Sequence, residues 1–286
     1  MNETLLRDYQ TQFSGSQPEM HVFSPYCVCP LGAHVDHQHG LVTGFALDRG
    51  IDIAFSATDD GTIEIASLSF PGMIVTNVRQ RQTERLFDWG DYLRGALWAL
   101  QQKHELRTGV RGIVRGSIPS GGVASSAALL CGFIMAVAKV NGLSLSRQSV
   151  VDLASRAERQ FVGLNNGVLD QSCVSLCQKN QLLFLDTDNG ASQLIPFGGQ
   201  AGAPLPFKIA IFYSGVTRAL TTTDYNLRVE ECQTAASILQ AYEEKRSAAP
   251  ESILRRVPRK AFDKYGSMMP PRFARRAEHF YGEHKR

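Results

Sequence analysis

The pattern of apolar and polar residues along the chain predicts both helices and strands. The longest uninterrupted apolar run, 129–140, predicts a buried helix whose first turn begins at Ser125 and Ser126. An amphipathic pattern predicts a helix over 89–104, and three further helices are expected over 146–162, 167–177 and about 223–243.

Shorter apolar runs predict strands. They cover 51–57, 62–66, 113–116, 181–186 and 207–213. The first two flank Asp-Asp-Gly at 59–61, which favours a β-hairpin. Because strands are followed by helices along the chain, the pattern implies an α+β protein.

A change of composition near residue 204 predicts a domain boundary. The segment 190–202 is rich in glycine, and Pro-Leu-Pro at 204–206 favours an extended connection. We therefore expect one domain over 1–203 and a second over 204–286.

Composition excludes several classes of protein. The chain has 286 residues, 43% of them hydrophobic and 20% charged, as expected of a globular protein. Its net charge of +3 does not indicate a nucleic-acid surface, and the basic residues crowded into 255–286 read as a solvated helical face. No signal pattern begins the chain and no apolar run is long enough to cross a membrane, so we expect a cytoplasmic protein without nucleic-acid or membrane partners.

Candidate metal ligands occur in two places. The six cysteines are dispersed and read as free thiols, and Cys27 and Cys29 lack the second cysteine pair of a zinc site. Four potential ligands also lie within six residues, at His34, Asp36, His37 and His39. These four side chains remain an alternative metal cluster.

The segment 116–128 pairs a glycine turn with the start of an apolar helix. Gly121 and Gly122 let the backbone approach an anion closely, and the unpaired N–H groups of the first helical turn would point at it. A serine hydroxyl there could reach a magnesium ion. The segment lacks the Gly-Lys-Ser/Thr of a Walker A loop, and the competing interpretation is a simple turn followed by a serine N-cap.

Three more segments, 24–38, 163–171 and 221–228, add to the evidence of this loop. The segment 24–38 resembles the sugar-binding motif of the galactokinase branch of the GHMP small-molecule kinases, and the loop 116–128 resembles its phosphate motif. The segments 163–171 and 221–228 resemble the Gly-Ile-Met-Asp-Gln and Tyr-Asn-Xaa-Arg motifs of the same branch. The resemblance implies a two-domain α+β fold, with a mixed sheet and helices in the N-terminal domain and a ferredoxin-like C-terminal domain. The family's third, glycine-rich motif is not found after residue 206, so the second domain is expected to be incomplete.

Within that branch the chain is most similar to galacturonokinases, through Cys-Pro-Leu-Gly-Ala-His-Val-Asp-His-Gln and Arg-Ala-Leu-Thr-Thr. The resemblance implies transfer of the γ-phosphoryl group of ATP to the anomeric hydroxyl of D-galacturonate, giving galacturonate 1-phosphate. Galactokinases have a glutamate where this chain has Ala33. A glutamate beside a substrate carboxylate would cost roughly 1–4 kcal/mol, so alanine at this position fits a sugar acid.

The resemblance also assigns residues. It implies that Asp170 is the catalytic carboxylate and that Cys27 occupies the position of an arginine that stabilises the catalytic aspartate and the transferring phosphoryl group. The resemblance implies that the substrate is contacted by Ala33, His34, Asp36 and Tyr225. It also implies that the phosphates of ATP are bound by Gly121, Gly122, Val123, Ala124, Ser125 and Ser126, and that Mg²⁺ is bound by Ser126 and Glu158.

Two alternatives stay open. The substrate could be galactose or another aldose, or the protein could be a non-catalytic regulator that binds sugar and nucleotide, an alternative favoured by Cys27. The cation that would pair with a uronate carboxylate is not fixed, with Arg218, Arg228 and His37 as candidates. We expect a monomer or a self-associating fragment.

Overall fold

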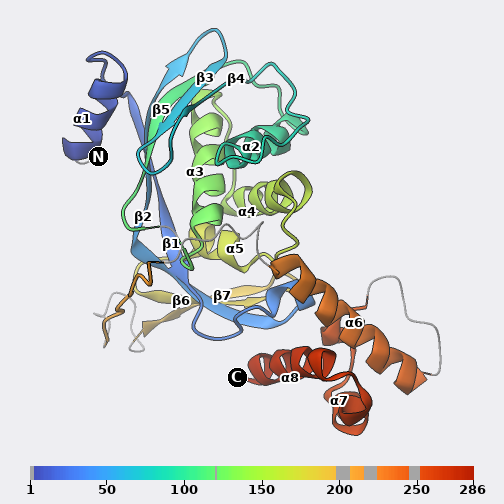
Figure 1. The fold of residues 1–286 in the computed structure, drawn as a ribbon. Helices are drawn as coiled ribbons and strands as arrows, with labels where there is room; N and C mark the ends of the chain where they lie inside the picture. Colours follow the sequence, from blue (N-terminus) through green and yellow to red (C-terminus); the bar gives the residue numbers. More distant parts are fainter. Residues whose placement is uncertain (1–2, 120, 198–206, 216–223, 245–251) are drawn as a thin grey trace.

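A mixed β-sheet lies at the centre of the structure, a computed structural model that describes residues 3–119, 121–197, 207–215, 224–244 and 252–286 (Figure 1). The strands are β1 (Met20–Val28), β2 (Leu41–Thr58), β3 (Thr62–Ser67), β4 (Met73–Asn77), β5 (Gly109–Gly116), β6 (Gln181–Asp186) and β7 (Ser192–Pro196). They lie in the order β4-β3-β5-β2-β6-β7, with β1 paired to β2. The pairing of β3 with β5 is parallel and the other pairings are antiparallel.

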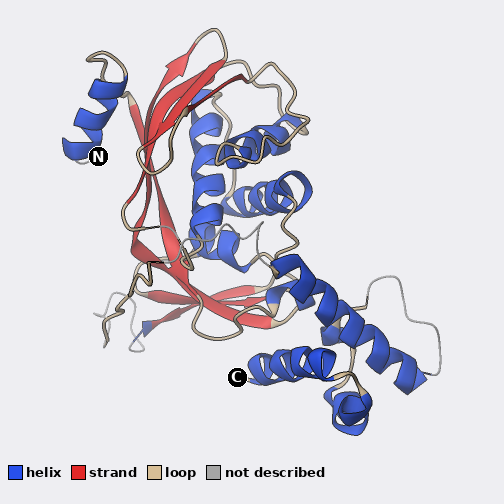
Figure 2. Cartoon of the chain, in the orientation of Figure 1, coloured by secondary structure: helices blue, strands red, loops and turns tan. Residues whose placement is uncertain are grey.

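Helices cover both faces of this sheet (Figure 2). The helices are α1 (Glu3–Gln12), α2 (Asp91–Gln101), α3 (Ser125–Val140), α4 (Arg147–Arg156), α5 (Leu169–Leu176), α6 (Tyr225–Glu244), α7 (Arg259–Tyr265) and α8 (Pro271–Lys285). Helices α2 to α5 lie on one face and α1 on the other.

Alternation along β2 assigns its side chains to the two faces. Ile53 and Phe55 belong to the core beneath α2 and α3, whereas Ala54 packs with Leu5 and Tyr9 of α1. This period of two is what a strand buried on both faces requires. The long strand β2 therefore connects the two apolar layers of the protein.

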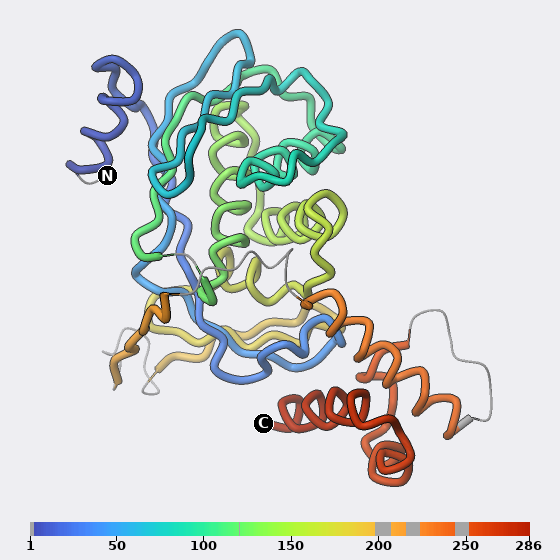
Figure 3. Tube along the Cα trace, viewed as in Figure 1, coloured from blue at the N-terminus to red at the C-terminus, as the bar shows by residue number. Residues whose placement is uncertain are grey.

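A second core joins the lower end of the sheet to helices α6 to α8. It contains Val42 of β2 and Leu185 of β6 together with Leu239 of α6 and Phe280 of α8. Figure 3 shows this arrangement, with the red C-terminal helix beside the orange trace of α6. The helices after residue 224 are therefore packed against the sheet.

The α+β class is confirmed, and so are the predicted helices and four of the five predicted strands. The predicted β-hairpin is wrong, because β2 and β3 do not pair with each other. Strand β5 lies between them, and its side chains Val110, Ile113 and Val114 are buried. A strand of such apolar character is more stable in the interior of the sheet than at an edge.

The predicted strand over 207–213 is also wrong. The described residues 207–215 have no strand, and the side chains of Phe207, Ile209 and Ile211 are exposed. Alternating apolar residues need a neighbouring strand to pair with, and none of the described strands pairs with this segment. The predicted domain boundary at 203/204 lies outside the described residues. Among the described residues, no helix has the length and apolar character that crossing a membrane requires.

Replacing Ile53 tests the packing of α3 on β2. Its side chain is fully buried, and its Cδ1 lies where a Cβ on Gly132 of α3 would be only 2.9 Å away. We expect Ile53→Ala to lower the free energy of unfolding by about 2–5 kcal/mol, because it leaves a cavity at this contact. Urea unfolding measures the loss. The matched control is Val75→Ala on β4, which is 62% exposed and should change stability by less than about 0.5 kcal/mol. Equal losses in the two variants would contradict this account of the core.

Candidate active site

The loop before α3 has the backbone of an anion cradle. Gly121 and Gly122 have φ angles of 143° and 73°, and Ala124, the residue before the helix, is left-handed at 58°. No side chain caps the first turn of α3, so the competing interpretation, a serine N-cap, is wrong. The N-terminus of α3 thus keeps backbone N–H groups available for an anion, in a loop whose conformation favours glycine.

Strand β1 holds this loop in place. The N–H of Cys27 donates a 3.2 Å hydrogen bond to the carbonyl of Val123, whose side chain is buried. The loop is therefore fixed to the strand that carries Cys27, one of the residues assigned from the sequence.

The segment that follows β1 brings Asp36 to the start of α5. One Asp36 carboxylate oxygen accepts the N–H of Leu169 at 3.2 Å. A Cβ on Gly167 would lie 2.2 Å from the same carboxylate, so a side chain at position 167 would displace it. Asp36 is thus fixed by α5, the helix that carries Asp170.

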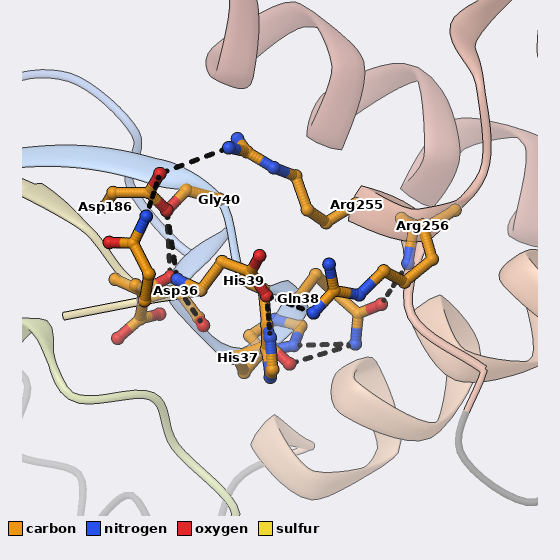
Figure 4. A network of polar contacts seen from close by, with 12 residues as sticks. Asp36, His37, Gln38, His39, Gly40, Asp186, Arg255 and Arg256 are labelled. Atoms are coloured by element: carbon orange, nitrogen blue, oxygen red, sulfur yellow. Dashed lines mark hydrogen bonds and ion pairs between the residues drawn. The ribbon is translucent and has the colours of Figure 1, made fainter. Parts of the chain in front are cut away.

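Residues from distant parts of the chain hold the loop around Asp36 (Figure 4). His39 pairs with Asp188, just after β6, at 2.9 Å. The buried amide of Gln38 accepts the N–H of Leu254 at 3.1 Å. The segment between α6 and α7 therefore helps to position Asp36.

Asp170 lies in the first turn of α5 beside two thiols. Its Oδ1 is 3.9 Å from Sγ of Cys27 and 3.8 Å from Sγ of Cys29. Burial, and then charge at Cys29, Asp36 and Glu158, raises the pKa of Asp170 well above its usual range. Conversely, the neighbouring thiols of Cys173 and Cys27 lower the pKa of Cys29 to about 4. A negative charge on Cys29 therefore disfavours ionisation of Asp170.

Glu158 lies in a π-helical turn, Ala157–Val162, that follows α4. It is fully buried, and burial raises its pKa. Asn166 and Gln171 donate to Oε2, whereas Oε1 has no hydrogen-bond partner. The Ser126 hydroxyl is close enough to lower the pKa of Glu158, although it makes no hydrogen bond of good geometry to Oε1.

The predicted magnesium ligands, Ser126 and Glu158, thus lie side by side, and the unpartnered Oε1 is an oxygen donor left for a cation. A hydroxyl and a carboxylate suit a hard ion such as Mg²⁺. The residues present therefore fit that metal.

Tyr225 begins α6 and lies against the histidines of the Asp36 loop. Its ring is edge-on to His34 and His37, with centroids 6.3 and 6.2 Å apart. Burial and the carboxylates of Asp36, Asp170 and Glu158 raise the pKa of Tyr225. Its hydroxyl therefore stays protonated at neutral pH and can donate a hydrogen bond.

A cavity of about 350 Å³ lies beside Asp36. Its lining includes Asp36, His37, His39, Arg159, Gly167 and Gln233. Arg159 was missed by sequence reasoning and forms no ion pair with any described residue. Ala33, His34, Asp170 and Tyr225 do not line this cavity.

The alternative metal cluster at His34, Asp36, His37 and His39 is wrong. Their ligand atoms do not converge, since His39 pairs with Asp188 and Asp36 caps α5. Among the described residues, the histidine, cysteine and carboxylate atoms that do converge are the sulfurs of Cys27, Cys29 and Cys173.

Comparison with known proteins places the chain in a family. Residues 91–178 match the model of the GHMP kinases N terminal domain. The galacturonokinase of Arabidopsis thaliana is 33% identical over 288 residues, which cover 93% of this chain and 66% of that protein. This chain belongs to the GHMP kinases. The galactokinase of Thermococcus kodakarensis is 30% identical, over 77% of this chain and 60% of its own length.

The fold agrees with this membership. The crystal structure of Lactococcus lactis galactokinase complexed with galactose matches 99% of this chain and 71% of that one, with a TM-score of 0.81 and 21% identity. The resemblance to GHMP kinases and the fold it implied are therefore confirmed. This GHMP kinase chain spans about three fifths to two thirds of the length of the curated relatives it matches.

The raised pKa of Asp170 predicts a dependence of stability on pH. In the folded GHMP kinase chain Asp170 binds its proton more tightly than in the unfolded chain, where its pKa is near 3.9. The free energy of unfolding therefore falls as pH rises from that value through the folded pKa. We expect Asp170→Asn to be more stable than the wild type at neutral pH and to lose this part of the slope.

Denaturant unfolding between pH 4 and 8 measures the effect. The control is Asp91→Asn, because the buried Asp91 carboxylate pairs with Arg94 and accepts the N–H groups of Leu86 and Phe87. That variant should lose about 1–3 kcal/mol. A destabilised Asp170→Asn at pH 7 would count against the burial of a charge at this position.

Proposed function

We propose that this GHMP kinase transfers the γ-phosphoryl group of ATP to the anomeric hydroxyl of D-galacturonate, giving galacturonate 1-phosphate. The observation that supports the proposal is that three carboxylates from separate segments, Asp36, Glu158 and Asp170, lie near enough for charge on one to affect the ionisation of another. Charge at Asp36 raises the pKa of both Glu158 and Asp170, and charge at Glu158 also raises the pKa of Asp170. Phosphoryl transfer depends on such positioning and on electrostatic stabilisation rather than on covalent chemistry of the protein.

The nucleotide phosphates are assigned to the loop 121–126 and the N-terminus of α3. The positive end of the helix dipole and the backbone N–H groups favour an anion there. Ser126 and Glu158 would hold Mg²⁺, which neutralises phosphate charge when it is bound.

Asp170 is proposed to accept the proton of the attacking sugar hydroxyl. A carboxylate with an ordinary pKa is a weak base, and the raised pKa of Asp170 makes this carboxylate a stronger base. Asp36 and the protonated Tyr225 supply an acceptor and a donor for neighbouring sugar hydroxyls.

Arg159 is proposed to bind the uronate carboxylate. Among the earlier candidates, Arg218 lies outside the described residues, Arg228 pairs with Asp224 and Glu231, and burial lowers the pKa of His37 so that it stays neutral. Arg159 lines the same cavity as Asp36 and has no acidic partner among the described residues. A guanidinium can bind a carboxylate through two parallel hydrogen bonds.

The first test is turnover. The chain is incubated with ATP, Mg²⁺ and D-galacturonate, with D-galactose in parallel, and ADP release is measured. We expect release with galacturonate, and we expect Asp170→Asn to lower kcat by about 10²–10⁴, because a proton acceptor at the reacting hydroxyl is removed. Calorimetry with each sugar shows whether the folded protein binds its ligands. Galacturonate binding without turnover would overturn the kinase proposal in favour of a regulator, and release with galactose alone would overturn the choice of substrate.

The second test concerns Arg159. We expect Arg159→Gln to raise the KM for galacturonate by about 10–100-fold, because a charged hydrogen bond is worth about 1.5–3 kcal/mol. The KM for galactose, which has no carboxylate, should stay the same. The matched control, Arg147→Gln, changes an exposed arginine at the start of α4 that does not line the cavity. An equal rise for both sugars would remove Arg159 from the assignment.

A further inference from the structure

Three thiols from two distant segments meet beside Asp170. The sulfur atoms of Cys27, Cys29 and Cys173 lie within 4.8 Å of one another. The first two are two residues apart at the end of β1, and the third lies on α5 one turn beyond Asp170. Residues three apart on a helix share a face, so α5 presents a carboxylate and a thiol to the same place.

The fold makes room for this cluster. A Cβ on Gly44 of β2 would lie 2.2 Å from Sγ of Cys173, so any side chain at position 44 would displace that sulfur. Cys27 and Cys173 are buried, whereas Cys29 is partly exposed. The exposed edge at Cys29 gives an ion a path to the two buried thiols.

The spacing of the sulfur atoms suits a metal ion. Zinc–sulfur bonds of about 2.3 Å in a tetrahedral site separate the sulfurs by about 3.8 Å, so shifts of about 1 Å or less would close the cluster around an ion. Oδ1 of Asp170 lies 3.8–3.9 Å from two of these sulfurs and supplies a fourth ligand. Thiolates select soft or borderline cations and disfavour Mg²⁺.

We propose that Cys27, Cys29 and Cys173 bind one thiophilic metal ion of the Zn²⁺ type, with Asp170 as the fourth ligand. This ion is separate from the Mg²⁺ assigned to Ser126 and Glu158. Binding needs neither ATP nor sugar, so it does not depend on the proposed function. Only the effect on turnover rests on the proposed function, because an ion bound to Asp170 would prevent that carboxylate from accepting the proton of the sugar hydroxyl.

Co²⁺ is a direct probe of the site. The reduced, metal-free chain is titrated with Co²⁺, and thiolate-to-metal charge-transfer absorption is followed, with elemental analysis for stoichiometry. We expect one Co²⁺ per chain, displaced by Zn²⁺. Cys29→Ser and Cys173→Ser should weaken binding at least tenfold, because each removes one of the thiolate ligands. Cys232→Ser, which changes a buried thiol on α6 outside the cluster, is the matched control and should bind like the wild type.

Two further variants separate binding from folding and from catalysis. Gly44→Ala keeps every thiol but displaces Cys173, so it should weaken Co²⁺ binding while circular dichroism reports the fold. Asp170→Asn should lose turnover but keep the charge-transfer band, because the three thiolates remain. The absence of that band in the wild type, or an equal band in Cys173→Ser, would overturn the metal site and leave the kinase proposal standing.

Discussion

The proximity of three buried or half-buried carboxylates is the constraint on which the rest of the site depends. Asp36, Glu158 and Asp170 come from segments far apart in the sequence, and the charge on one disfavours ionisation of another. Such a group persists only if the fold supplies donors or cations to it. The structure supplies the N–H of Leu169 to Asp36 and two amides to Glu158, and it leaves Oε1 of Glu158 without a partner.

The sheet explains how these segments come together. β2 pairs with β1 and β5 along its second half and with β6 at its beginning, so it links the strand carrying Cys27 to the strand that ends beside the Asp36 loop. The core between β2 and α3 fixes the helix whose N-terminus faces the anion cradle. The second core, which includes α6 and α8, carries Tyr225 to the same place. The position of the site therefore depends on both cores.

Local patterns predicted the parts of this structure that local forces determine. The helices 125–140 and 225–244 were predicted from the sequence pattern, and the pair Ser126 and Glu158 came from the family resemblance. The order of strands in the sheet could not be predicted from local patterns, because β5, about fifty residues further along the chain, lies between β2 and β3. Arg159 and Cys173 were missed for a related reason: each is an ordinary helical residue until the fold places it beside Asp36 or Cys27.

The thiols beside Asp170 change the electrostatics of the position where the family resemblance implies an arginine. A guanidinium at position 27 would favour the ionised form of Asp170, whereas Cys29 raises the pKa of Asp170 and so has the opposite effect. A divalent ion bound there would not restore the arginine's role, because the negative charge of three thiolates exceeds that of the cation. It would instead bind the Asp170 carboxylate directly and withdraw it from proton transfer. The cluster therefore acts on the availability of Asp170 and does not replace the positive charge.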